Sequence, residues 1–139
     1  MKDIYPFILE ALNNGSTATI VVSGISMQPM LYNGRDTVTL SKPKFPLKKY
    51  DLPLFRLDDG RFILHRVIDI NKDGTYICRG DNRWESEDGI RDDQIIGVVT
   101  SFVRNGKRTV IKNSLLYFLY TRTWKVMHHF KKYYKYFKR

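Results

Sequence analysis

Short runs of apolar and β-branched residues, separated by turn-forming residues, make up most of the chain before residue 112. Runs of this length and composition are typical of β-strands, and their regular spacing is typical of an all-β domain. They predict strands over residues 17–22, 37–40, 52–56, 62–68, 75–78, 95–103 and 107–111. The expected fold is therefore mainly β, with the strands forming a coiled sheet or a partly open barrel.

Turn residues between these runs predict hairpins. The predicted turns are Asp58-Asp59-Gly60, Asn71-Lys72-Asp73-Gly74 and Arg104-Asn105-Gly106. The Asn-Gly pair in the last of them indicates a type I′ turn. Pro53 lacks a backbone N–H, so the strand over residues 52–56 is expected at the edge of a sheet. The strand over residues 62–68 is expected to be continuous, with His65 and Val67 on the same face.

Apolar residues at helical spacing predict a helix at each end of the chain. In residues 1–13 they recur three and four positions apart, and Asp3 is the expected N-cap. From Asn113 onward, leucines and aromatic residues recur among lysines and arginines, which predicts a basic amphipathic helix. We therefore divide the chain into a β-rich domain, residues 1–112, and a C-terminal helix, residues 113–139.

The formal net charge of +10 is concentrated in the C-terminal part of the sequence. All 14 acidic residues lie at or before Asp93, whereas no acidic residue accompanies the lysines and arginines from Arg104 onward. A basic, aromatic, amphipathic helix over residues 113–139 suits an anionic membrane surface. Docking of the helix on its own sheet is an equal alternative. Binding of phosphates ranks third, so nucleic acid is not an expected partner.

The segment from Val21 to Leu31 carries the first candidate for chemistry. A β-branched run leads into a turn that contains Ser26, with Gly24 before it and Pro29 after it. Glycine can adopt positive φ and proline ends the strand, so the turn can present the hydroxyl at the edge of a sheet. Backbone N–H groups of such a turn are free to face an oxyanion. On these residues alone, an ordinary turn serine is the more common interpretation.

His65 and a carboxylate-rich segment follow Ser26 in an order that suits a catalytic triad. An imidazole is a natural general base for a serine because it is mostly neutral at cellular pH. The carboxylates within residues 79–89 can orient that imidazole. Arg66 is expected to be structural and to pair with a carboxylate near the Gly80-Asp81 turn. Calcium binding by the acidic segment is disfavoured because its spacing is not that of an EF-hand loop.

Together these motifs resemble the signal peptidase and LexA-type clan of serine peptidases. The resemblance spans residues 17–103 and keeps the family's order. It rests on Gly24-x-Ser26-Met27-x-Pro29, His65-Arg66-Val67 and Gly80-Asp81-Asn82. Bacterial signal peptidases and LexA-like repressors have a lysine at the position of His65. The ER-type and archaeal-type signal peptidases have a histidine there, so the chain resembles that branch.

The resemblance implies a serine endopeptidase that cleaves a peptide or a precursor protein, with Ser26 as nucleophile and His65 as general base. It also implies catalytic roles for Asp81 and Asp88, while Glu87 stands where the ER-type branch carries its second acid. Which of these carboxylates orients the imidazole is left open at this point.

Many signal peptidases have a serine two residues before the nucleophile, whose hydroxyl contributes to the oxyanion hole. Gly24 stands at that position here, so the oxyanion hole is expected to rest mainly on the backbone N–H of Ser26. Two alternatives keep the same fold. One is a LexA-like self-cleaving protein, which is disfavoured because no Ala-Gly or Cys-Gly pair is present. The other is a catalytically silent module that binds a peptide or a membrane.

No cofactor or metal is expected. Cys78 is the single cysteine and is expected in a buried strand. His128 and His129 are adjacent, so on a helix they would point to different faces and make a poor metal pair. The sequence has neither a secretory-signal pattern nor an apolar run long enough for a transmembrane helix. A cytoplasmic location, with peripheral attachment at the inner face of the membrane as a variant, is therefore expected.

Overall fold

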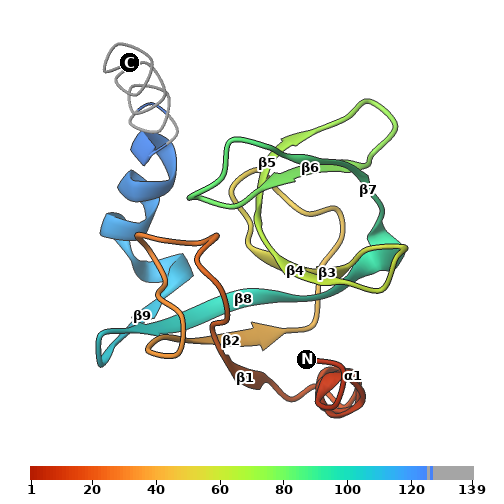
Figure 1. Cartoon of the computed structure of the whole chain (residues 1–139), viewed down its shortest axis with the longest axis horizontal. Coiled ribbons are helices and arrows are strands. Elements are labelled where there is room, and N and C mark those ends of the chain that lie inside the picture. Colours follow the sequence, from red (N-terminus) through yellow and green to blue (C-terminus); the bar gives the residue numbers. More distant parts are fainter. Residues whose placement is uncertain (125, 127–139) are drawn as a thin grey trace.

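Two antiparallel sheets form the body of the protein (Figure 1). The computed structural model describes residues 1–124 and 126. The larger sheet has the strand order β1-β2-β8-β3-β4, with β9 paired to β8, and it curls into a half-barrel. The smaller sheet has the order β5-β6-β7. The expectation of a mainly β fold with a coiled sheet is confirmed at this level.

Most strands lie close to their predicted positions. The strands are β1 (Ala18–Val21), β2 (Thr37–Ser41), β3 (Pro53–Arg56), β4 (Phe62–Leu64), β5 (Arg66–Ile70), β6 (Tyr76–Arg79), β7 (Glu87–Ile90), β8 (Ile95–Arg104) and β9 (Lys107–Val110). Strand β7 lies in the carboxylate-rich segment, where no strand was predicted. The predicted Asn-Gly hairpin joins β8 to β9. Asn105 and Gly106 have φ angles of 51° and 82°, as a type I′ turn requires.

Helices lie at both ends of the described chain. Helix α1 (Tyr5–Asn13) begins after Ile4, which makes no side-chain cap, so the prediction of Asp3 as N-cap is wrong. Proline in the first turn begins the helix instead, because its φ fits and its missing N–H needs no partner there. Short 3-10 helices follow β7 and β9, η1 (Asp92–Gln94) and η2 (Ile111–Asn113). Residues 115–124 and 126 are helical, and the remainder of the predicted C-terminal helix, including His128 and His129, lies outside the described residues.

Strand β8 is the centre of the larger sheet because it pairs with β2, β3 and β9. Its Gly97 makes room for α1, since a Cβ there would lie 3.0 Å from Leu12 Cδ1 and 3.2 Å from Leu40 Cβ. Helix α1 buries Ile8 and Leu12 in the main core. The i, i+4 spacing of these two residues thus fixes the side of the sheet that α1 covers.

Strand β3 lies inside the larger sheet, between β8 and β4, so the prediction of an edge strand is wrong. Pro53 is the first residue of β3, where its missing N–H does not interrupt the ladder. A proline restricts a strand only at positions that must donate a hydrogen bond, and the first residue can escape that requirement.

The predicted strand over residues 62–68 is two strands. Strand β4 belongs to the larger sheet and β5 to the smaller one, and His65 lies between them. After the break, Val67 exchanges backbone hydrogen bonds of 2.8 Å with Tyr50 and Asp51. The chain therefore crosses from one sheet to the other at His65, which places this side chain at the seam between them.

A second apolar cluster fills the space beside this seam. It includes Phe55, Val67, Tyr76 and Cys78, all fully buried. Cys78 lies on β6, as expected for a buried strand cysteine. Burial, and to a lesser extent the nearby Glu87, raise the pKa of its thiol to about 12, so the thiol stays protonated at neutral pH.

The turn that follows Ser26 is held at its far end by the buried carboxylate of Asp36. Asp36 accepts hydrogen bonds from the backbone N–H of Tyr32 at 2.7 Å and of Asn105 at 3.0 Å, and from Arg35 at 2.8 Å. Burial alone would raise the pKa of Asp36, but these hydrogen bonds outweigh it and lower the pKa to about 2. The carboxylate thereby ties the turn to the β8–β9 hairpin.

Asp36→Asn is expected to destabilise the protein strongly at neutral pH and less in acid. The folded pKa of about 2 lies below the unfolded value of about 3.9, so the ionised carboxylate stabilises the fold above the unfolded pKa. This contribution is lost as the pH falls through the folded pKa. Urea unfolding should therefore give a difference between wild type and variant that shrinks from pH 7 toward acid. Asp3→Asn, at an exposed carboxylate, is the control. A pH-independent difference for Asp36→Asn would contradict the prediction.

Candidate active site

Ser26 lies in the turn between β1 and β2, half-buried. Gly24 has a φ of 81° and its N–H donates to Asn33 Oδ1 at 2.9 Å, which turns the chain after β1. The next residues form a helical turn, in which Leu31 N–H donates to Met27 O at 3.0 Å. Met27 and Leu31 are both buried. Their burial anchors the turn, so the serine between the glycine and the buried methionine has a fixed backbone.

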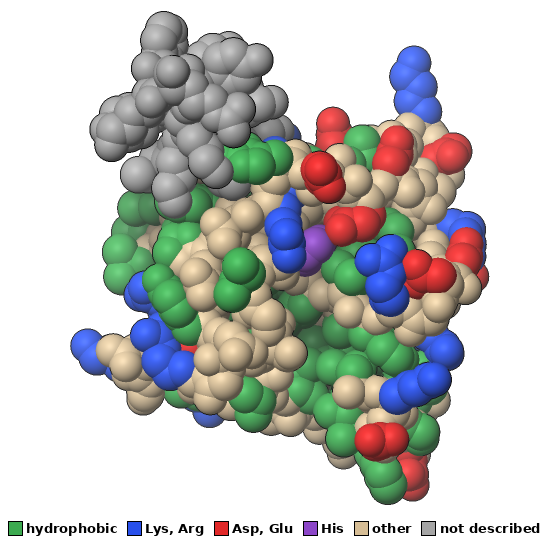
Figure 2. All heavy atoms as spheres, viewed as in Figure 1, with side chains coloured by type: hydrophobic (Ala, Val, Ile, Leu, Met, Phe, Trp, Pro, Cys, Tyr) green, Lys and Arg blue, Asp and Glu red, His purple; other side chains and the backbone are tan. Residues whose placement is uncertain are grey.

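His65 lies at the seam of the two sheets with only 7% of its surface exposed. Its Nδ1 lies 2.9 Å from Glu87 Oε2, and Glu87 is the first residue of β7. The carboxylate favours the tautomer with the proton on Nδ1, which leaves Nε2 free to accept a proton. In Figure 2 the histidine, drawn in purple, lies at the rim of a hollow with hydrophobic side chains.

Gly80 is the point at which the three motif segments meet. A Cβ on Gly80 would lie 2.6 Å from Ser26 O and 3.0 Å from His65 Nε2. Only a residue without a side chain fits between the turn and the imidazole. Asn82 then fastens the two loops, because its N–H donates to Ser26 O at 2.8 Å and its Nδ2 donates to Ile25 O at 3.1 Å. The predicted Ser26 and His65 are thus brought together on either side of Gly80.

The polar groups of Ser26 itself are largely free. Within the described part of the chain, neither its Oγ nor its backbone N–H makes a hydrogen bond, and the same holds for the Met27 N–H. Adjacent unpaired N–H groups beside a hydroxyl can stabilise an oxyanion. The serine hydroxyl is not hydrogen-bonded to His65 Nε2, and such bonds are often long before substrate binds.

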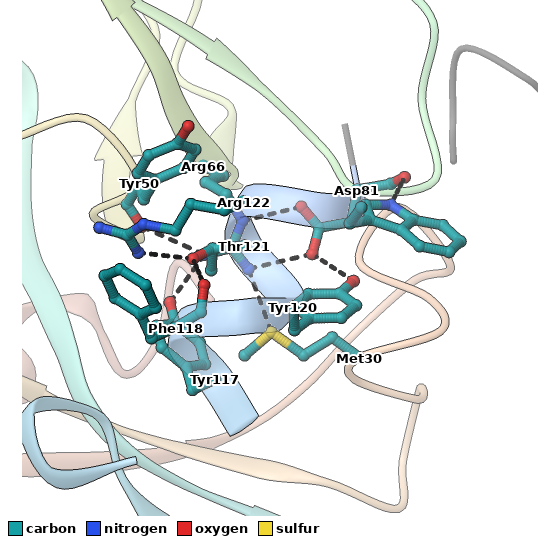
Figure 3. Close-up of polar contacts among 10 residues, drawn as sticks. Met30, Tyr50, Arg66, Asp81, Tyr117, Phe118, Tyr120, Thr121 and Arg122 are labelled. Atoms are coloured by element: carbon teal, nitrogen blue, oxygen red, sulfur yellow. Dashed lines mark hydrogen bonds and ion pairs between the residues drawn. The ribbon is translucent and has the colours of Figure 1, made fainter. Parts of the chain in front are cut away.

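Asp81 does not contact His65 through its carboxylate. Asp81 is buried and forms a bidentate ion pair with Arg66, in which Nε lies 2.9 Å from Oδ1 and Nη2 lies 3.0 Å from Oδ2 (Figure 3). Tyr120 donates a further hydrogen bond to Oδ2 at 2.8 Å, and Trp124 Nε1 donates to the Asp81 backbone O at 2.7 Å. The Asp81 carboxylate therefore holds neighbouring segments together and does not orient His65. The expected pairing of Arg66 with a carboxylate near this turn is confirmed.

The Arg66 guanidinium holds several segments at once (Figure 3). Besides Asp81, it donates to Tyr117 Oη at 2.7 Å, to Tyr50 O at 3.1 Å and to Met30 Sδ at 3.1 Å. Burial would lower the pKa of Arg66, but the charge of Asp81 outweighs it and raises the pKa above its ordinary value. The pKa of Tyr120 is also raised, first by burial and then by the Asp81 charge. At neutral pH the Arg66 guanidinium therefore stays charged and the Tyr120 hydroxyl stays protonated.

Asp88 also lies away from the imidazole. Its Oδ1 accepts hydrogen bonds from Asn71 Nδ2 at 2.8 Å and from Gly89 N–H at 2.7 Å. Adjacent residues of a strand point to opposite faces, so β7 can direct only one of Glu87 and Asp88 at His65. Glu87 is that residue. Of the three carboxylates left open by the sequence, it alone contacts the imidazole.

The described residues offer no obvious metal site. No group of three or more His, Cys, Asp and Glu side chains among them is arranged to hold a metal ion. Over the same part of the chain, no helix is both long and apolar enough to cross a membrane.

Comparison with known proteins leaves the family unassigned. No protein-family model, no curated protein and no solved structure matches the chain. The likeness to signal peptidases and LexA-type peptidases therefore stays a prediction from the motifs, and the function has to be argued from the geometry of the site.

Glu87→Gln is expected to slow reaction of Ser26 with a fluorophosphonate probe by about a hundredfold or more, because the amide no longer favours the required tautomer or stabilises the imidazolium. Asp88→Asn is the matched control, since it alters the neighbouring carboxylate on the same strand. Its labelling rate should equal that of wild type. Equal rates for Glu87→Gln and wild type, measured by intact-protein mass spectrometry, would remove Glu87 from the site.

Gly80→Ala is expected to reduce the same labelling by about a hundredfold, because the added Cβ would push the Ser26 backbone away from the imidazole. Gly97→Ala is the control. Its Cβ would meet Leu12 and Leu40 in the core, so it costs stability without touching the site. Both variants should melt below wild type, and only Gly80→Ala should lose labelling while still folded. Full labelling of folded Gly80→Ala would contradict this geometry.

Proposed function

We propose that the protein is a serine endopeptidase, with Ser26 as nucleophile, His65 as general base and Glu87 as the residue that orients the base. One observation carries the proposal: the imidazole has a carboxylate on Nδ1 at 2.9 Å, while its Nε2 lies beside Gly80 and the Ser26 turn. A histidine buried only for packing has no need of both a carboxylate and a neighbouring serine with a free hydroxyl.

In this mechanism His65 Nε2 removes the proton from Ser26 Oγ as the oxygen attacks a peptide carbonyl. The backbone N–H of Ser26, joined by that of Met27, stabilises the negative charge on the carbonyl oxygen. The imidazolium, stabilised by Glu87, then gives its proton to the leaving amine as the C–N bond breaks. A water molecule, deprotonated by Nε2, then attacks the acyl-enzyme, and the imidazolium returns the proton to Ser26 Oγ as the acyl–oxygen bond breaks and the acid product leaves.

The edge of β1 supports a peptide as the substrate class. Strand β1 pairs with β2 on one side, and no other described strand pairs with it. An extended peptide that added to this free edge would have its backbone held by hydrogen bonds as it ran toward Ser26. Val21 and Ile25, 57% and 55% exposed, offer apolar surface next to this edge. A small ester or amide would use none of these features.

A catalytically silent peptide-binding module is the second candidate. The observation that favours it is the missing hydrogen bond between Ser26 Oγ and His65 Nε2. In a silent module the same β1 edge would hold a peptide without cleaving it. Peptide binding without turnover distinguishes this candidate from the peptidase.

Ser26→Ala and His65→Ala are each expected to abolish cleavage of a complex peptide library, because the first removes the nucleophile and the second removes the base. New termini are identified by mass spectrometry after incubation with wild type and with each variant. Ser23→Ala, at an exposed serine three residues earlier in the same segment, is the matched control and should cleave like wild type.

New termini that vanish in both variants and persist in Ser23→Ala would establish the peptidase and its subsite preferences. Termini that persist in Ser26→Ala would exclude this serine as the nucleophile. A wild type that binds library peptides and cleaves none would favour the silent module.

A further inference from the structure

The helix over residues 115–124 exposes its apolar side chains, which is the reverse of an ordinary surface helix. Its exposed apolar residues are Leu115 (71% exposed), Leu116 (81%), Phe118 (50%) and Leu119 (47%), and Val126 (56%) follows them. Leu115, Leu119 and Val126 are spaced i, i+4 and i+11, so they lie along one face of a helix. Single exposed leucines are common, but a continuous apolar stripe marks an interaction site.

The opposite face of the helix is occupied by the protein itself. Tyr117 and Thr121 are buried, 8% and 2% exposed. Tyr117 Oη accepts a hydrogen bond from Arg66, and Tyr120 and Trp124 donate hydrogen bonds to Asp81 as described above. These contacts fix the rotation of the helix about its axis. The apolar stripe therefore faces outward because the hydroxyl- and indole-bearing side chains are needed inside.

Basic side chains lie beside the stripe. Arg104 and Lys107, from the β8–β9 hairpin, line a groove of about 540 Å³ together with Leu116, Tyr117 and Tyr120. Lys112 precedes the helix and Arg122 lies on it, stacked on Phe118 at 3.8 Å. None of the basic residues described from Arg104 onward forms a salt bridge with a described acidic residue. Figure 2 shows hydrophobic and basic side chains next to each other on this side of the molecule.

We propose that the apolar stripe (Leu115, Leu116, Phe118, Leu119 and Val126) and its basic surround (Arg104, Lys107, Lys112 and Arg122) dock on an anionic phospholipid surface. Leucine and phenylalanine side chains would enter the boundary between headgroups and acyl chains, while the lysines and arginines face lipid phosphates. The combination of basic and apolar side chains favours a lipid surface over a second copy of the chain or a nucleic acid. A second copy would bring two uncompensated basic surfaces together, and nucleic acid would leave the leucines without apolar contact.

Flotation of the full chain with phospholipid vesicles tests the proposal. Wild type is expected to bind vesicles containing phosphatidylglycerol at least about tenfold more tightly than vesicles of phosphatidylcholine alone, and to bind less tightly as salt is added. Leu115→Gln with Leu119→Gln is expected to weaken binding by about tenfold or more, because it removes apolar area without changing charge. Ile4→Gln with Phe7→Gln, at exposed apolar residues of the N-terminal segment, is the matched control and should bind like wild type.

A second pair of variants tests the charged part. Arg104→Gln with Lys107→Gln, at the two basic residues that line the groove, should weaken binding to the anionic vesicles. Lys42→Gln with Lys44→Gln, an equal change of charge at exposed lysines elsewhere, should not. Ser26→Ala should bind like wild type, so this proposal can fail or succeed independently of the peptidase. The proposal would be overturned if wild type did not float with the vesicles, or if the Leu115→Gln, Leu119→Gln variant bound as tightly as wild type. It would also be overturned if the protein bound an oligonucleotide more tightly than vesicles, or formed a dimer that the same variant disrupts. Circular dichroism melting confirms that each variant is folded.

Discussion

The buried ion pair between Arg66 and Asp81 is the interaction on which the rest of the site depends. Arg66 directly follows His65, and Asp81 directly follows Gly80. The ion pair between Arg66 and Asp81 therefore holds the His65 imidazole next to Gly80. The remaining guanidinium donors reach the Ser26–β2 segment, the loop before β3 and the C-terminal helix. Desolvating such a pair is costly, and removing one partner typically costs about 3–5 kcal/mol because the other charge is left buried alone.

Three carboxylates illustrate how environment assigns roles to one functional group. Asp36 and Asp81 are buried, accept several hydrogen bonds and hold loops in place. Glu87 is less buried and shares its one described side-chain contact with a titratable imidazole. The charge of a carboxylate paired with an arginine is already compensated by the guanidinium. A carboxylate that contacts an imidazole can instead stabilise the imidazole when it gains a proton. Of the three, Glu87 makes the fewest contacts that hold loops in place, and it is the carboxylate that can stabilise a protonated imidazole.

Much of the fold could be predicted from the sequence because its determinants are local. The Asn-Gly turn at Asn105 fixed a hairpin, and the periodicity of α1 located a helix. The switch of sheets at His65 could not be predicted, since a continuous apolar run has the same pattern whether it stays in one sheet or crosses to another. The choice of Glu87 over Asp81 depended on long-range competition for Asp81 by Arg66 and Tyr120. The meeting of Ser26 and His65 at Gly80 likewise arises only from tertiary packing.

The contacts of Tyr120 and Trp124 with Asp81 tie the start of the C-terminal helix to the β-rich domain. These side chains complete the hydrogen bonding of a residue that adjoins the site, so the start of the C-terminal helix is part of the polar core. A protease cut before this helix would do more than release an appendage. It would expose the buried carboxylate of Asp81 and remove the contact of Arg66 with Tyr117, so an ordered site depends on the helix over residues 115–124.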